Sequence, residues 1–330
     1  MEVNRIYCGD AFEQTKCIPA GSVDLVVTSP PYANQRKGTY GGVAPDRYVE
    51  WFLPLGAALY HALNPQGSFV LNIKENVVEG QRSDYVFRLV LALQQQGWLW
   101  TETYLWHKRN ATPGKWPNRL RDAWEYCFHF TKQRKFAMYQ DAVKIPVGDW
   151  AAKRMKSLSE HDWTRSISAT GSGFGRNVSN WQGRDTVFPD NVVGGEDVAP
   201  HAWVTARVQQ AINGQTSAET AAKDILTMFD ATRVLDEEYG NVLHEAAVCN
   251  NKEHSAAFPE TLPEFFIKLF TTKNDLVFDP FLGSGTTVKV ARDLERRFLG
   301  FELKPEYFDK AVNRLKLEDL GEHFAFDAMI

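Results

Sequence analysis

The stretch that decides the fold is LVFDPFLGSGTT, residues 276–287. Leu276–Asp279 is a short apolar run typical of a buried strand, and Gly283-Ser284-Gly285 is a turn that small residues make tightly. Thr286 and Thr287 are suited to begin a helix. In open α/β folds such turns lie at the carboxyl edge of a parallel sheet, where ligands bind. The stretch therefore predicts an α/β fold with a ligand-binding turn.

A carboxylate strengthens this prediction. The next apolar run, Phe298–Phe301, ends in Glu302, which lies about 20 residues beyond the glycines, as the acidic residue of nucleotide sites does. Such a carboxylate can accept protons from both hydroxyls of a ribose. A GxG turn alone is weak evidence, and an ordinary strand-to-helix turn with a surface glutamate is the alternative. The spacing favours a nucleoside-like cofactor.

A second motif, Thr28-Ser29-Pro30-Pro31-Tyr32, follows the apolar run Val23–Val27 near the start of the chain. An exocyclic base amine is a poor nucleophile because its lone pair is delocalised into the ring. The Ser29 hydroxyl and the Pro30 carbonyl can accept its two protons, and the prolines stiffen the turn. Tyr32 offers a ring for stacking on an extruded base. A strand-ending turn with a core tyrosine is the alternative. Together with the glycine turn, the motif indicates methyl transfer to a base amine, with Ser29, Pro30, Pro31 and Tyr32 as catalytic residues.

Strand and helix patterns alternate on both sides of a central region. We expect strands at 23–28, 68–73, 99–106, 126–130, 276–279 and 297–302, and helices at 47–63, 84–96, 218–229, 262–270, 286–294 and 306–317. This order predicts a mostly parallel, doubly wound sheet. Between about 146 and 200 the periodicity fades and Gly, Ser, Asn and Asp dominate, which is typical of a functional loop region.

The composition is that of an ordinary globular protein, with 44% hydrophobic and 24% charged residues. No run is long enough for a membrane span and no signal segment opens the chain. Four cysteines without CxxC spacing indicate neither a zinc site nor a disulfide framework, so we expect no metal and a cytoplasmic location. The net charge is −4, yet basic residues gather at 107–135 and 151–184. Such local basic faces can bind phosphates, although a solvated basic surface is the alternative.

These motifs resemble the amino-group DNA methyltransferases that use S-adenosylmethionine, in the permuted beta-group order. The family tetrapeptide (Ser/Asp/Asn)-Pro-Pro-(Tyr/Phe) is met by Ser29–Tyr32, and the cofactor loop DPFxGSGTT by Asp279–Thr287. Tyr7–Asp10 resembles the opening segment whose aspartate approaches the adenine of the cofactor. His254–Pro259 resembles the HPAxFP segment that closes over the methionine portion, with Ser255 in place of the customary proline.

The resemblance implies a Rossmann-like methyltransferase with an inserted target recognition region. Residues 1–140 would form the catalytic half, 141–248 the insert and 249–330 the cofactor-binding half. The cofactor-binding residues it implies are Asp10, Thr28, His254, Phe258, Pro259, Asp279, Pro280, Phe281, Gly283, Ser284, Gly285, Thr286, Thr287 and Glu302.

A serine at the head of the tetrapeptide is commonest among family members that methylate cytosine N4, which we prefer, with adenine N6 as the alternative. Cytosine C5 methylation is excluded because no cysteine follows a proline. RNA or a protein amide as substrate, and a catalytically silent DNA-binding protein, are further alternatives. The expected partners are double-stranded DNA and a cognate restriction endonuclease, with the enzyme a monomer or a dimer.

Duplex DNA hides its amino groups, so the target base must flip out. The basic, glycine-rich loop Gln35–Gly42 directly follows the tetrapeptide and is suited to hold the opened strand. Other basic residues before the insert would contact phosphates, and polar residues of the insert would read base edges. The predicted DNA-binding residues are Arg36, Lys37, Lys108, Arg109, Lys115, Arg119, Arg165, Arg176, Asn180, Gln182 and Arg184.

Overall fold

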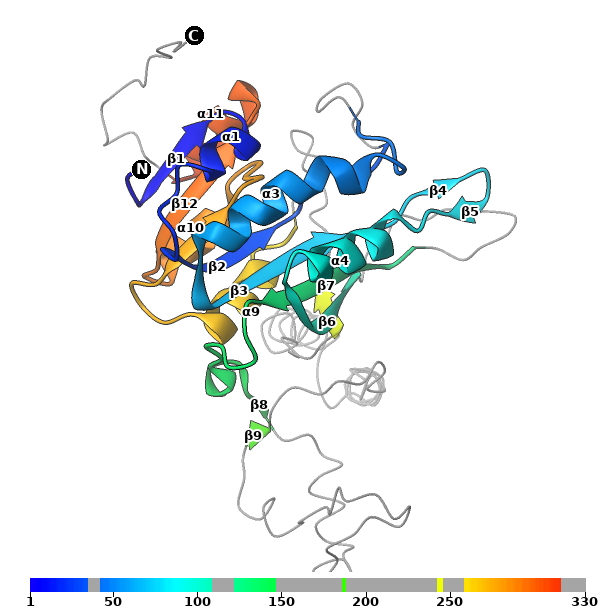
Figure 1. Cartoon of the computed structure of the whole chain (residues 1–330). Helices are drawn as coiled ribbons and strands as arrows, with labels where there is room; N and C mark the ends of the chain where they lie inside the picture. The colour runs from blue at the N-terminus through cyan, green and yellow to red at the C-terminus, as the bar shows by residue number, and fades with distance from the viewer. Residues whose placement is uncertain (35–41, 109–121, 147–185, 188–241, 246–257, 316–330) are drawn as a thin grey trace, which may run out of the picture. The chain divides into compact units, whose positions relative to one another are not determined.

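The computed structural model describes residues 1–34, 42–108, 122–146, 186–187, 242–245 and 258–315 (Figure 1). The chain divides into two compact units. One comprises Met1–Tyr139 and Asn241–Ile330, and the other comprises Gln140–Gly240. The two motifs of the sequence analysis both lie in the first unit.

An eight-stranded sheet forms the centre of the first unit, in the order β1-β12-β11-β2-β3-β7-β6-β10. β7 runs antiparallel to its neighbours β3 and β6, and the other neighbouring strands are parallel. The prediction of a mostly parallel sheet is therefore confirmed. The strands are β1 (Arg5–Cys8), β2 (Val23–Thr28), β3 (Leu63–Ile73), β6 (Leu99–Lys108), β7 (Trp124–Thr131), β10 (Val242–Glu245), β11 (Leu276–Asp279) and β12 (Arg297–Glu302).

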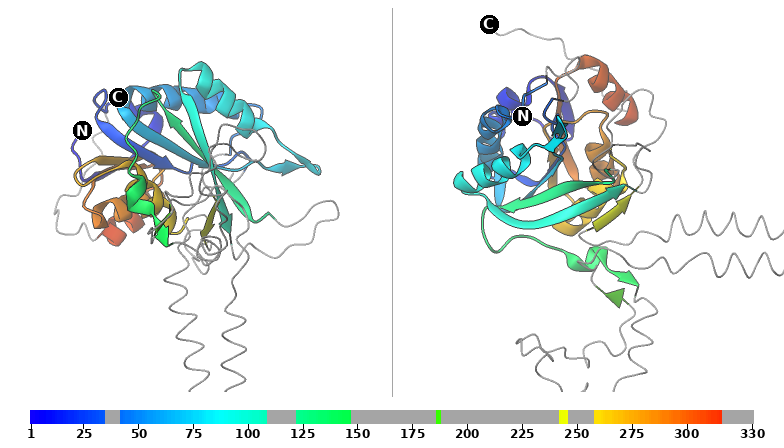
Figure 2. Two further views of the ribbon diagram at one scale, coloured as in Figure 1. Left: turned by 90° about the horizontal axis from the view of Figure 1, so that it is seen from below. Right: turned by 90° about the vertical axis from the view of Figure 1, so that its right-hand side faces the viewer.

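Helices cover both faces of this sheet (Figures 1 and 2). One face carries α1 (Ala11–Thr15), α3 (Tyr48–Ala62) and α4 (Tyr85–Gln95), and the other carries α9 (Thr261–Phe270), α10 (Thr286–Asp293) and α11 (Pro305–Leu315). Among the described residues, no helix has the length and apolar character that crossing a membrane requires.

The core lies between the sheet and these helices because apolar residues recur at helical spacing on α3 and α4. These two helices bury Tyr48, Phe52, Leu55, Leu59, Leu89 and Leu93 completely. The strands beneath contribute Val26, Phe69, Leu71, Phe130 and Phe278, also fully buried. Removing this much apolar surface from water is the main stabilising contribution to such a domain. It gives the strand ends that carry both motifs a rigid base.

Most of the predicted elements match the structure, apart from the start of β3 and several short elements that were not predicted, among them α1, β1 and β10. β3 begins at Leu63, although Asn64-Pro65-Gln66-Gly67 was read as a closing turn; Leu63 pairs with Val23 across a register irregularity. β1 was not predicted as a strand, but it pairs with β12. The helix predicted at 218–229 lies outside the described residues.

Smaller elements complete the described residues. In the first unit β4 (Val77–Val78) and β5 (Gln81–Arg82) pair as a short antiparallel ribbon. In the second unit the 3-10 helix η1 (Gln140–Val143) precedes β8 (Ile145–Pro146), which pairs antiparallel with β9 (Thr186–Val187).

Candidate active site

The two motifs meet at the carboxyl edge of the sheet. β2 and β11 are parallel neighbours, with Val26 opposite Phe278. At the ends of these strands the Thr28 hydroxyl donates a hydrogen bond of 2.7 Å to Oδ1 of Asp279. The two residues are 251 positions apart in the chain and both are buried. The proline turn after β2 and the glycine turn after β11 therefore leave the sheet side by side.

Asp279 joins the strand, the turn and the helix that follow one another here. Its Oδ2 accepts a hydrogen bond of 2.7 Å from the Thr287 hydroxyl, and its Oδ1 also accepts the Phe281 amide at 3.1 Å. Burial raises the pKa of the Asp279 carboxyl to about 6, against the lowering effect of these donors. Thr28, Asp279 and Thr287 were predicted to bind cofactor. Their side chains instead bond to one another in the interior, so we assign them to holding the turn.

The glycine turn needs glycine for conformational reasons. Gly283 and Gly285 have φ of 56° and 84°, in the left-handed region that other residues rarely adopt. A Cβ on Gly285 would also lie 3.1 Å from Cβ of Ala311 on α11. The turn thus packs closely against α11 on one side and leaves backbone amides at the start of α10.

Glu302 ends β12 beside this turn, as its spacing predicted. Glu302 is 3% exposed; its Oε2 accepts the Gly283 amide at 2.8 Å and its Oε1 accepts the Lys304 amide at 2.9 Å. The backbone amides on either side of the carboxylate therefore fix the orientation of Glu302 beside the glycine turn.

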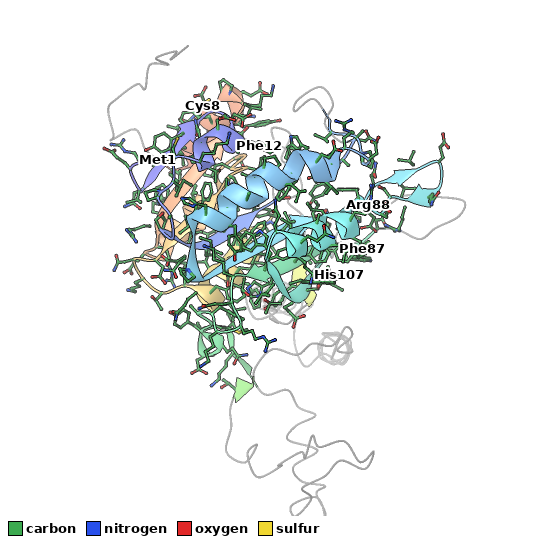
Figure 3. The ribbon with its side chains drawn as sticks, in the orientation of Figure 1. Met1, Cys8, Phe12, Phe87, Arg88 and His107 are labelled. Carbon is green, nitrogen blue, oxygen red and sulfur yellow. The ribbon has the colours of Figure 1, made fainter. Side chains whose placement is uncertain are left out.

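The opening segment lies next to Glu302. The Gly9 amide donates to the Glu302 carbonyl at 2.8 Å, and Asp10 caps α1 by accepting the Phe12 amide at 2.7 Å. The Phe12 ring, labelled with nearby Cys8 in Figure 3, lies 5.1 Å from the Trp51 ring and 6.4 Å from the Phe281 ring. Asp10, Phe281 and Glu302 thus gather at one edge of the sheet, and their acidic and aromatic character fits a nucleoside.

An ion-pair cluster ties the glycine turn to the start of α9. Arg314 of α11 donates to the Thr286 hydroxyl at 3.0 Å, to the Ser284 hydroxyl at 3.4 Å and to Glu260 at 2.6 Å. Lys289 of α10 also binds Glu260, at 2.8 Å. Glu260 directly follows Phe258, which is 9% exposed, and Pro259. The structure therefore brings the predicted Phe258-Pro259 segment to the glycine turn, while His254 lies outside the described residues.

The catalytic turn is anchored by hydrogen bonds on its inner side. Pro30 is buried, and the Tyr48 hydroxyl donates to the Pro31 carbonyl at 2.8 Å. The Ser29 hydroxyl donates to the Tyr32 hydroxyl at 3.2 Å. Tyr32 was predicted as a stacking ring; its ring is half-buried and its hydroxyl is bound to the protein. The turn is thus preorganised with Ser29 at its start.

Glu125 and Asn72 are site residues that the sequence reasoning missed. The Tyr32 hydroxyl lies 2.6 Å from Oε2 of Glu125 on β7 and 3.1 Å from Oδ1 of Asn72 on β3. Both residues are buried, at 6% and 2% exposure. One signal could have revealed Glu125: it is the single carboxylate in an otherwise aromatic and apolar strand, WEYCFHFT.

Lys108 does not present its ammonium to DNA in the way we predicted. Its Nζ forms an ion pair with Oε1 of the buried Glu125 and lies 4.6 Å from the centroid of the Trp106 ring. An ammonium bound to a buried carboxylate is poorly placed to anchor a phosphate, so we withdraw this residue from the DNA-binding set. The other predicted DNA-binding residues lie outside the described residues: Arg36, Lys37, Arg109, Lys115, Arg119, Arg165, Arg176, Asn180, Gln182 and Arg184.

Comparison with known proteins places this site in a family. A family model described as "DNA methylase" matches residues 23–313. The chain is 30% identical to the type II methyltransferase M.PvuII of Proteus hauseri, over 96% of this chain and 85% of that protein. It is 25% identical to the type II methyltransferase M.SfiI of Streptomyces fimbriatus, over 92% and 88% of the two chains.

Solved structures agree in fold. The PvuII DNA methyltransferase, described as cytosine-N4-specific, has a TM-score of 0.58 at 23% identity, covering 100% of this chain and 89% of that one. A DNA modification methylase from Thermus thermophilus, in complex with S-adenosyl-L-methionine, has a TM-score of 0.51 at 19% identity, covering 96% and 95%.

The chain therefore belongs to the DNA methylase family. The predicted fold class, enzyme class and cofactor are confirmed at the level of this family. The reading as a catalytically silent DNA-binding protein is correspondingly disfavoured.

Proposed function

We propose that this DNA methyltransferase modifies the N4 amine of cytosine within a specific sequence of duplex DNA. The observation that carries the proposal is the hydrogen bond between Thr28 and Asp279, which joins a serine-type proline turn to the glycine turn of a cofactor site. The choice of base is supported by the relative M.PvuII, because the solved PvuII DNA methyltransferase is described as cytosine-N4-specific. Adenine N6 is the alternative target within the same family.

The residues around the glycine turn fit S-adenosylmethionine. We assign the ribose hydroxyls to Glu302, whose carboxylate is held by the Gly283 and Lys304 amides. We assign the adenine side to Asp10 and Phe281, and the methionine portion to the segment of Phe258 and Pro259. When bound, the cofactor supplies an electrophilic methyl group on a sulfonium. Pro280, Ser284, Gly285 and Thr286 complete the proposed site by shaping the turn.

The proline turn acts on the nucleophile. The Ser29 hydroxyl and the Pro30 carbonyl accept the two protons of the base amine, which favours a tetrahedral nitrogen with an available lone pair. Because the acceptors are fixed before the base arrives, little reorganisation is needed at the moment of reaction. The Tyr32 ring, held by its hydroxyl, stacks on the base, and Pro31 keeps the turn rigid through its bond from Tyr48.

The wider assignments rest on the relatives. Several are named type II methyltransferases, which supports a role beside a restriction endonuclease in the cytoplasm, whereas M.BamHII of Bacillus amyloliquefaciens, 26% identical, is named an orphan methyltransferase. The basic and amide side chains at 36–37, 109–119 and 165–184 remain our proposed contacts to phosphates and base edges. The target recognition role of residues 141–248 likewise remains a proposal.

The test is to incubate the purified enzyme with S-adenosylmethionine carrying a labelled methyl group and with varied duplex DNA, and then to analyse the nucleosides. We expect label in N4-methylcytosine. Label in N6-methyladenine would replace the proposed base, and label in RNA but not in DNA under matched conditions would replace the proposed substrate. Mapping the modified positions would identify the recognised sequence.

A further inference from the structure

We propose that Glu125 is a positioning residue that acts through Tyr32 and fixes the Ser29 hydroxyl as a hydrogen-bond acceptor toward the target amine. The inference rests on the proposed function and adds a residue outside both motifs. Glu125 lies on β7 and contacts the catalytic turn through the Tyr32 hydroxyl.

The Tyr32 hydroxyl has one proton and two acceptors on its inner side. Oε2 of Glu125 lies at 2.6 Å and Oδ1 of Asn72 at 3.1 Å. The orientation of the Asn72 amide follows from its own bonds, because its Nδ2 donates to the Tyr126 carbonyl at 3.0 Å. An ionised carboxylate and an amide oxygen can only accept. Tyr32 must therefore donate inward and has only lone pairs to offer to Ser29.

This direction decides what Ser29 can do. A serine hydroxyl can either donate or accept, and its rotation is free unless a neighbour restricts it. At 3.2 Å the Tyr32 oxygen accepts a hydrogen bond from the Ser29 hydroxyl, so the Ser29 lone pairs remain for the protons of the base amine. With the opposite direction, Ser29 would aim its own proton at the nitrogen and compete for the lone pair that attacks the methyl group.

Two cations lie beside the Glu125 carboxylate at the inner end of this hydrogen-bonded series. Lys108 forms an ion pair with Oε1 of Glu125, and Lys74 interacts favourably with the Glu125 charge. Burial and the Glu125 charge together raise the pKa of Tyr32 well above its usual range, so the phenol keeps the proton that it donates. The Glu125 side chain is only 8% exposed, which limits competition from water.

A double-mutant cycle tests whether Glu125 acts through Tyr32. Y32F keeps the aromatic ring for stacking and removes only the hydroxyl. In E125Q we expect the amide oxygen to face Lys108 and the NH2 group to face Tyr32. Tyr32 then loses the stronger of its two inner acceptors. We expect kcat to fall about tenfold in Y32F and about threefold in E125Q, with KM for DNA and for the cofactor within about twofold of wild type. The double variant Y32F/E125Q should match Y32F.

The controls separate positioning from folding. E102Q changes an exposed carboxylate on the neighbouring strand β6 and should leave kcat unchanged. E125D restores the charge and should recover more activity than E125Q. The proposal is overturned if Y32F and E125Q keep wild-type kcat, or if their effects multiply in the double variant. A wild-type enzyme that labels no DNA in the same assay would instead contradict the proposed function.

Discussion

Replacing Thr28 with valine tests the link between the two turns. Valine keeps the shape and burial of threonine and removes the hydroxyl that donates to Asp279. A hydrogen bond to a charged acceptor contributes about 1.5–3 kcal/mol, and the Asp279 carboxylate would lose one of its donors in the interior. We therefore expect T28V to lower the free energy of unfolding by about 2 kcal/mol at pH 8.

The effect of T28V should depend on pH. The pKa of Asp279 is raised to about 6, so the carboxylate is ionised at pH 8 and mostly protonated at pH 5. A bond to the neutral acid contributes less, and the difference between wild type and T28V should narrow to about 1 kcal/mol at pH 5. Removal of the Thr28 donor also raises the pKa of Asp279 further, so the difference in unfolding free energy between wild type and T28V begins to narrow at a higher pH.

Urea unfolding followed by tryptophan fluorescence at both pH values provides the measurement. T15V is the matched control, because Thr15 is equally buried and its hydroxyl donates to the neutral Ala11 carbonyl at 2.6 Å. T15V should cost at most about 1 kcal/mol and show no such pH dependence. Equal losses in T28V and T15V at both pH values would refute the assignment of Thr28 and Asp279 as the junction between the turns.

Three further changes test other parts of the account. G285A adds a side chain at a left-handed φ and against α11, so it should lower Tm and weaken S-adenosylmethionine binding in a thermal shift assay. The effect should exceed that of G21A, whose φ of 65° is also left-handed but whose added Cβ would lie in ordinary contact with Pro65, at 3.9 Å. E302Q should weaken cofactor binding about tenfold in calorimetry, because a carboxamide replaces a charged acceptor; unchanged affinity would exclude the ribose assignment. Burial lowers the pKa of His129 to about 3 from 6.5, so its stabilisation is complete above pH 6.5 and is lost as the pH falls. Wild type should lose about 2 kcal/mol more than H129Q between pH 7 and pH 5 in urea unfolding, and equal losses would contradict the buried neutral imidazole.

The elements could be predicted from sequence where local pattern dictates them. Apolar runs that end in proline or glycine marked β2 and β11 to the residue, because a buried strand and a tight turn leave a strong local signal. β3 was placed five residues too late because Asn64-Pro65-Gln66-Gly67 has the composition of a turn, although Leu63 already pairs with Val23. Whether residues with the composition of a turn adopt an extended backbone depends on their pairing with the neighbouring strand.

The site residues could be predicted from the sequence only in part, because some of their roles depend on contacts that local pattern does not reveal. Ser29 and Glu302 were predicted from motif chemistry, but the interior role of Thr28 depends on its contact with Asp279, 251 positions away in the chain. Lys108 was read as a DNA contact because a count of charges does not reveal ion pairs. Glu125 is not part of a recognisable motif, and it lies beside Tyr32 because β7 pairs antiparallel with β3.

The most direct test of the central claim is the single-turnover rate of methyl transfer by S29A at saturating S-adenosylmethionine, measured alongside its equilibrium affinity for the cofactor. We predict near wild-type affinity with transfer slowed by about a hundredfold, because the lost acceptor serves the amine and not the cofactor. Wild-type transfer by S29A, or loss of cofactor binding in place of turnover, would contradict the assignment of Ser29 to the target base.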